Sequence, residues 1–228
     1  MRNPILTRKS VAGLAAIAVL AVPLAGCAQD EGAGGGEGEG NQNSSQQAEP
    51  EAVASIPALT GQDTAVALDE GFVAALEQLQ LAPGVVGDAK LEGGSLVFPI
   101  TGGNVTVFKP GTVDPYVIGQ IQHENSGLSL TAGKTTVEIT NLNVDPGASK
   151  VYGDVAVNGE VAATSVPVFN LDGRTLKPLQ AQGDQAILEG TKVTVSEVAA
   201  PLLNDTFKTD AVKPGLLVGI AKITVNTK

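Results

Sequence analysis

Short runs of β-branched and aliphatic residues, separated by glycine-containing turns, fill most of residues 56–228. Such residues fit the pleated surface of a strand, and a pair such as Asn158-Gly159 is typical of a two-residue hairpin turn. Leu96, Phe98 and Ile100 have the period-two spacing that places side chains on one face of a strand. The predicted strands cover residues 95–100, 104–108, 117–122, 128–132, 135–144, 151–157, 186–195 and 216–225. Many short strands joined by tight turns predict a mainly β fold, an antiparallel β-sandwich with one or two short helices.

Two segments have a helical pattern. Asp69 can cap a helix in which Phe72, Leu76 and Leu79 form one apolar stripe, and this helix would cover an open side or end of the sandwich. A second helix is predicted near residues 198–207. Pro201 has no amide proton and belongs in the first helical turn, so the second helix should begin at residue 199 or 200.

One strand is expected to be irregular. Val137 and Ile139 are out of phase with Leu142 and Val144, although all four lie in one apolar run. Because the side-chain period of a strand is two, this change of phase predicts a bulge or bend near residues 140–141.

The N-terminal segment has the order of a signal peptide. Arg2, Arg8 and Lys9 precede an apolar run of 14 residues, 11–24, and small residues follow it. Spanning a bilayer takes about 20 residues, so the run predicts a cleaved signal rather than a permanent membrane helix.

The signal ends in the tetrapeptide Leu24-Ala25-Gly26-Cys27, which resembles the lipobox of bacterial lipoproteins. The resemblance implies cleavage between Gly26 and Cys27 and a diacylglyceryl group on the Cys27 thiol. Two acyl chains hold a protein stably at a membrane. We therefore expect an extracytoplasmic protein at the cell surface, anchored to the cell membrane through lipid on Cys27. The alternative is an ordinary secretory signal with an incidental cysteine.

Residues 27–55 are rich in Gly, Glu and Gln and contain almost no large apolar side chain. Such a segment cannot offset the entropy of ordering, which predicts a flexible linker between the anchor and a single domain at residues 56–228. Cation binding by Glu31, Glu37 and Glu39 is the alternative to simple solvation of these carboxylates.

The charge of the exported chain is strongly negative. Residues 1–26 contain three basic and no acidic residues, so the remaining formal charge is 11 − 24 = −13. Nucleic acids and anionic surfaces need clustered Lys and Arg, so both are disfavoured as partners.

Reactive side chains are scarce. The chain has one histidine and one cysteine, which leaves no multi-histidine zinc site and no Cys-His nucleophile. We predict no catalytic residue and no metal site. The expected function is a non-catalytic binding or structural domain at the cell envelope, for a small ligand or an envelope protein. A hydrolase acting on cell-wall glycans is an alternative that only the location supports.

A family resemblance covers residues 95–154. The segments SLVFPITGG, GQIQHENSGLSLTAGKTTVEITNLNVDP and VYGDV resemble the core of the HtaA-domain family, found in actinobacterial surface proteins that bind and pass on haem. The resemblance implies a β-sandwich with short helices, and it makes haem the candidate cofactor and haem uptake an alternative function. The family's haem-ligating tyrosine corresponds best to Ala75, so that ligand does not carry over.

Three residues are the candidates for ligand binding. His123 has the same phase as Val117 and Ile121, so it should face the apolar side of its strand, either as a ligand or as a hydrogen-bonded, half-buried side chain. Tyr116 and Tyr152 are the two tyrosines, and either could ligate haem iron. Both have the opposite phase to neighbouring valines, which also suits partly exposed strand residues.

Overall fold

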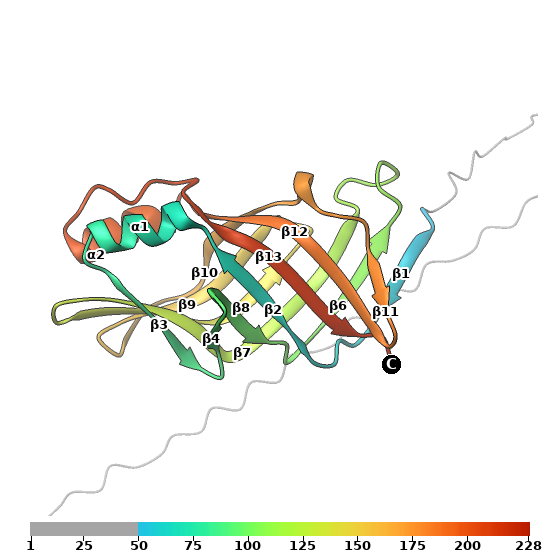
Figure 1. Ribbon diagram of the computed structural model, residues 1–228, viewed down its shortest axis with the longest axis horizontal. Helices are drawn as coiled ribbons and strands as arrows, with labels where there is room; N and C mark the ends of the chain where they lie inside the picture. Colours follow the sequence, from blue (N-terminus) through green and yellow to red (C-terminus); the bar gives the residue numbers. More distant parts are fainter. Residues whose placement is uncertain (1–49) are drawn as a thin grey trace, which may run out of the picture. The chain divides into compact units, whose positions relative to one another are not determined.

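The structure is a computed structural model that describes residues 50–228 (Figure 1). These residues form thirteen strands, two α-helices and one short 3-10 helix, η1. The predicted mainly β, antiparallel fold with two short helices is therefore confirmed. Within the described part, neither helix has the length and apolar character needed to cross a membrane. The signal peptide, Gly26, Cys27 and most of the predicted linker lie outside the described residues.

The strands follow one another along the chain with short connections. Their bounds are β1 (Ala52–Ile56), β2 (Gln62–Leu68), β3 (Ala82–Gly87), β4 (Lys90–Glu92), β5 (Ser95–Pro99), β6 (Gly102–Phe108), β7 (Val117–Ala132), β8 (Thr135–Asp145), β9 (Lys150–Val157), β10 (Glu160–Asp172), β11 (Gln180–Gln182), β12 (Gln185–Val195) and β13 (Leu217–Asn226). The helices are α1 (Glu70–Gln78), α2 (Ala199–Phe207) and η1 (Gly173–Thr175).

All thirteen strands belong to one antiparallel sheet. Its order is β1-β6-β7-β8-β9-β10-β12-β13-β2-β5-β4, with β11 paired to β12 and β3 paired to β7. The sheet folds over, because Phe98 on β5 and Thr64 on β2 contact His123 on β7, far from them in the strand order. The two expected layers are therefore parts of one continuous sheet that encloses a common interior (Figure 1).

The predicted inward faces are buried. Leu96 and Phe98 on β5 are buried, as are Val105 and Val107 on β6. The alternation in the sequence thus identified the core side of β5 and β6. The hairpin between β9 and β10 is also confirmed, because Val157 pairs with Glu160 and the two turn residues have the positive φ angles of a type I′ turn.

Both helices begin where the sequence predicted. The Asp69 carboxylate accepts hydrogen bonds from the amides of Gly71 and Phe72, at 2.9 and 3.3 Å, and so caps α1. The helix α2 begins at Ala199 and contains Pro201 in its first turn. Both helices lie at the same end of the sheet (Figure 1, left), where α1 packs on β3 and β13 and α2 packs on β8 and β10.

The irregularity predicted in β8 is confirmed. The pairing of β8 with β9 shifts between Thr140 and Asn143, and Asn141 has a φ of 52°. The predicted break between residues 122 and 128 was wrong, because both segments belong to β7. The β7–β8 pairing resumes at Gly127 after a bulge, in which the Asn125 amide donates to the Asn141 side chain at 3.0 Å.

Several strands were not predicted. The strands β2, β3, β4 and β11 are short and contain many Ala, Gly, Gln or charged residues, and β10 is interrupted by a bulge near Ser165. The pairing of β1 with β6 also places the first strand at Ala52, four residues before the predicted start of the domain. Its side chains alternate, with Ala54 and Ile56 packed against the core and Val53 exposed.

Candidate functional site

The folded-over sheet encloses a cavity of about 760 Å³. Its wall is formed by inward-facing side chains from ten strands, mostly valine, leucine and isoleucine. The apolar lining residues include Val66, Leu96, Phe98, Val105, Val107, Ile121, Leu128, Leu142, Val144, Val151, Phe169, Leu188, Val193, Val218, Ala221, Ile223 and Val225. Cavities of about 300–1,000 Å³ with apolar walls are typical of sites for small organic ligands.

The cavity is elongated along the strands. On β13 its wall runs from Val218 to Val225, which is about 23 Å at roughly 3.3 Å per residue. A cube of the same volume would have sides of only about 9 Å. The space is therefore a long channel between the layers of the sheet.

His123 lies at the inner part of this channel and is 2% exposed. Its Nδ1 is 3.2 Å from the Leu142 carbonyl oxygen, which can only accept, so Nδ1 carries the proton. Its Nε2 then accepts a hydrogen bond from the Thr64 hydroxyl at 2.8 Å. Burial lowers the pKa of His123 to about 4, although the bond to Leu142 opposes that shift. At neutral pH the histidine is uncharged and both ring nitrogens are engaged.

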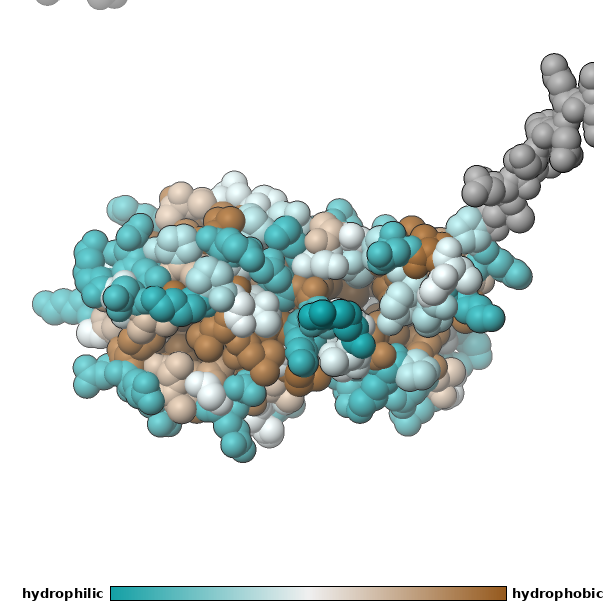
Figure 2. All heavy atoms as spheres, turned by 90° about the horizontal axis from the view of Figure 1, so that it is seen from above, coloured by the Kyte–Doolittle hydropathy of each residue, from teal (hydrophilic) through white to brown (hydrophobic). Residues whose placement is uncertain are grey.

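The mouth of the channel lies between two chain segments. One is the β6–β7 connection, which contributes Asp114, Pro115 and Tyr116, and the other runs through η1 and contributes Asp172 and Arg174. Every charged lining residue therefore lies at the mouth. Figure 2, seen from the side on which these segments rise in Figure 1, shows a hollow near the middle of the molecule with hydrophobic side chains around it.

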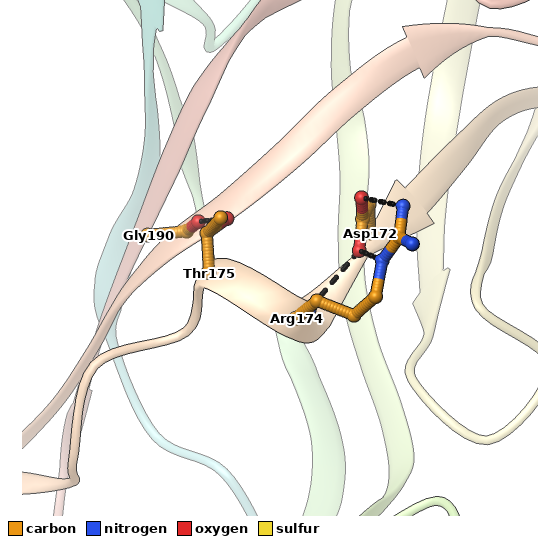
Figure 3. Close-up of polar contacts among 4 residues, drawn as sticks. All are labelled: Asp172, Arg174, Thr175 and Gly190. Atoms are coloured by element: carbon orange, nitrogen blue, oxygen red, sulfur yellow. Dashed lines mark hydrogen bonds and ion pairs between the residues drawn. The ribbon is translucent and has the colours of Figure 1, made fainter.

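The segment at η1 is fixed by polar contacts (Figure 3). Asp172 accepts from the backbone amide of Arg174 at 3.0 Å, and from its Nε and Nη2 at 2.9 and 2.8 Å. These bonds hold the pKa of the Asp172 carboxyl well below its usual range. The Thr175 hydroxyl donates to the Gly190 carbonyl at 2.6 Å.

Gly190 is required for this contact. It has a φ of +113°, and a Cβ there would lie 2.4 Å from the Thr175 carbonyl oxygen. Glycine therefore lets the segment after η1 lie directly against β12, and Leu176 and Leu179 of this segment line the channel.

The three candidate residues do not meet at one point. Tyr116 lines the mouth, whereas His123 lies seven residues further along, about 23 Å by strand rise. Tyr152 is half-buried on β9 between the buried residues Val151 and Gly153, so it points to the opposite face of the sheet. The predicted facing of His123 is confirmed, and the side chain is more deeply buried than the half-buried state we expected.

His123 does not offer a free nitrogen to haem iron in this arrangement, because its Nε2 accepts a hydrogen bond from the Thr64 hydroxyl. Tyr116 fits better, since its phenol lies at the wall of the mouth. Ala75, at the family's tyrosine position, lies on α1 and does not line the channel. Among residues 50–228, no three His, Cys, Asp or Glu side chains gather in a way that could hold a metal ion.

The channel, Thr64 and Arg174 were not predicted from the sequence. One signal for the channel was present, because aromatic residues make up 3% of the chain and tryptophan is absent. The inward-facing positions are mainly valine, leucine and isoleucine, and phenylalanine or tyrosine lines the channel at only three positions, so few large rings occupy the space between the two parts of the sheet.

Comparisons with known proteins give a distant structural likeness. No protein-family model matches the chain, and no curated protein matches it. The structure is similar to the C-terminal domain of HtaA from Corynebacterium glutamicum, with a TM-score of 0.49 and 14% sequence identity over 77% of this chain and 98% of that domain. A domain-swapped dimeric variant of the same domain gives a TM-score of 0.43 and 14% identity over 70% and 94% of the two chains. The distant HtaA-like resemblance seen in the sequence thus recurs in the structure, and it assigns no ligand to this chain.

Proposed function

We propose that this chain is an extracytoplasmic, membrane-anchored lipoprotein whose β domain binds an apolar small molecule inside the sheet and does not transform it. The observation that carries the proposal is the channel of about 760 Å³ with branched aliphatic walls. Protein interiors are close-packed and contain few voids larger than a water molecule. A channel of this size lowers stability when empty, so it is best explained by a ligand that fills it.

The chemistry of the lining favours binding over catalysis. His123 is neutral and hydrogen-bonded through both nitrogens, so it has no free site to accept a proton from a substrate. Asp172 at the mouth is tied to Arg174. The remaining wall is almost entirely hydrocarbon, which contributes affinity in proportion to the buried area, about 25 cal/mol per Å².

The anchor supports the same function. A linker of roughly 25 residues between Cys27 and β1 spans about 28 Å when flexible, which keeps the channel close to a membrane, a source of apolar molecules. Mass spectrometry of the native protein tests the anchor. We expect an N-terminus at Cys27 carrying a diacylglyceryl group, and an intact Met1 or an unmodified thiol would contradict it.

Titration with N-phenylnaphthylamine, an uncharged apolar fluorophore, tests binding. The protein is the exported chain, residues 27–228, with Cys27→Ser so that no lipid is attached and no detergent is needed. We expect a saturable rise in fluorescence with one site per chain. Phenylalanine at both Ala186 and Ala221 should weaken binding at least tenfold, because both alanines line the channel.

The matched control carries phenylalanine at Ala67 and Ala162, two exposed strand alanines that do not line the channel. It should bind as the parent chain does, and circular dichroism should show that both variants are folded. Equal binding by the two variants, or no saturable binding by the parent chain, would refute the proposal.

Haem binding is the second candidate function, and Tyr116 at the mouth is the observation that favours it. Hemin belongs in the same titration as a contrast ligand. A Soret shift that is abolished by Tyr116→Phe, together with displacement of the fluorophore, would favour haem over other apolar ligands. A Soret band unchanged by Tyr116→Phe and His123→Ala would end the haem hypothesis.

A further inference from the structure

We infer that the ligand is a lipid with a long acyl chain, which extends into the channel toward His123 and Thr64 and leaves its polar head at the mouth. The inference rests on the proposed function and adds the class and the orientation of the ligand. It follows from the shape of the channel, from the distribution of charge along it and from the state of Arg174.

The shape suits a chain. The channel extends about 23 Å along β13, and the acyl chains of one membrane leaflet reach about 15 Å, half of a hydrocarbon core of about 30 Å. Its aromatic lining is limited to Phe98, Phe169 and Tyr116, which lie on different strands. Branched aliphatic walls pack well around methylene groups and provide no flat aromatic slot for a ring.

The distribution of charge sets the direction. In the inner part, His123 and Thr64 bond to each other, and His123 also bonds to the Leu142 carbonyl. The other polar side chains of the strands that line the channel include the hydroxyls of Thr191 and Thr194 on β12. A polar group placed there would lose its hydration without gaining a partner, at a cost of about 1–3 kcal/mol or more. The inner end of the ligand is therefore hydrocarbon, and its polar end stays at the mouth beside Asp114, Asp172 and Arg174.

Arg174 is suited to meet that polar end. Its guanidinium has five N–H donors, and its bonds to Asp172 use one at Nε and one at Nη2. The side chain is 90% exposed, so the other donors are free to bond carbonyl, carboxylate or phosphate oxygens. Asp172 both fixes the guanidinium and balances its charge, so the mouth can accept an ester as well as an acid.

Competition against bound N-phenylnaphthylamine tests the inference on the same Cys27→Ser chain. The competitors are octanoic, lauric, palmitic and stearic acids, each below its micelle concentration. We expect affinity to rise about tenfold with each added pair of methylenes, because each one buries further apolar surface, and to level off when the chain fills the channel.

The variant Ala221→Phe tests whether the acyl chain of the ligand binds inside the channel or on the surface of the protein. Ala221 lies partway along β13, so a phenyl ring there shortens the channel, and affinity should level off at shorter acids than it does in the parent chain. The control Ala67→Phe should give the parent profile. Arg174→Gln should weaken palmitic acid and monopalmitoylglycerol severalfold and should weaken the uncharged fluorophore less than either.

The outcomes distinguish this inference from the proposed function. If the fluorophore binds and no acid displaces it, or if the affinity of the acids is independent of their chain length, the inference of an acyl ligand is refuted. The proposed binding of an apolar small molecule then still stands. If the fluorophore does not bind, both fail. Palmitic acid binding more tightly than monopalmitoylglycerol supports an acyl ligand with a free carboxylate, and the reverse order supports one with a glycerol ester.

Discussion

Thr64 and His123 meet in the channel although 59 residues separate them in the chain. The sequence showed that His123 faces the apolar side of its strand, and it favoured a hydrogen-bonded side chain. It could not show the partner, because β2 reaches β7 only after the sheet has folded over. The same contact explains why this histidine is fully buried and neutral. An uncharged, hydrogen-bonded side chain is compatible with a hydrocarbon ligand beside it.

The state of His123 predicts a dependence of stability on pH. Its pKa is about 4 in the folded chain and about 6.5 when unfolded, so the unfolded chain binds the proton first as the pH falls. Stability is unaffected by this group above pH 6.5, decreases as the pH falls toward 4, and is lower by about 2 kcal/mol at pH 5.

Urea unfolding of the parent chain and of His123→Gln measures this effect, and the chain has one histidine, so no other imidazole contributes. The variant should be less stable at pH 7 and should lose less stability between pH 7 and pH 5 than the parent chain. Parallel curves for the two proteins would show that His123 is not buried in the neutral state.

At the scale of elements, a row of hydrogen-bonded polar side chains lies across β7, β8, β9 and β10, where these strands share a bend. The Asn125 backbone amide donates a hydrogen bond to the side-chain oxygen of Asn141 at 3.0 Å, and the Asn141 side-chain nitrogen donates to Asp154 at 2.9 Å. Asp154 also accepts from the Ser165 amide at 2.9 Å, and Asn125, Asn141 and Ser165 all have positive φ angles. On β8, β9 and β10, every residue that lines the channel lies on one side of this row.

Asp154→Ala tests this row. It leaves the Ser165 amide and the Asn141 side chain without their acceptor, so we expect a loss of about 2 kcal/mol in the free energy of unfolding. The control is Glu160→Ala, an exposed residue at the start of β10, which should cost less than about 0.5 kcal/mol. Similar unfolding curves for the two variants in urea would mean that the row does not hold the bend.

Only part of this row could be predicted. The bend in β8 was visible because Val137 and Ile139 are out of phase with Leu142 and Val144. The bulge in β7 was not, because Glu124, Asn125 and Ser126 followed by glycine are typical of a turn. The strand continues there since Asn141 bonds Asn125 from the neighbouring strand, and such a contact between distant residues leaves no mark in a local pattern.

For the whole molecule, alternation and turn residues predicted an antiparallel β fold. The Asp69 cap with its apolar stripe predicted α1, and Pro201 predicted the start of α2. These patterns could not predict that one sheet would form both layers, because that depends on the pairing of β12 with β13 and of β13 with β2. The channel follows from that topology and from inward-facing side chains that are mostly aliphatic, with few large aromatic rings. The proposed function belongs to this scale, since no single residue carries it.

Methyl NMR of the exported chain during titration with N-phenylnaphthylamine tests the central claim most directly. The aromatic rings of the ligand shift the resonances of methyl groups beside them. We predict saturable shifts for Ile121, Val193 and Val218, which line the channel, and none for Leu76 and Leu203, which are buried at the helices. Shifts confined to surface methyl groups, or no shift at saturating ligand, would contradict the claim that the sheet encloses a binding site.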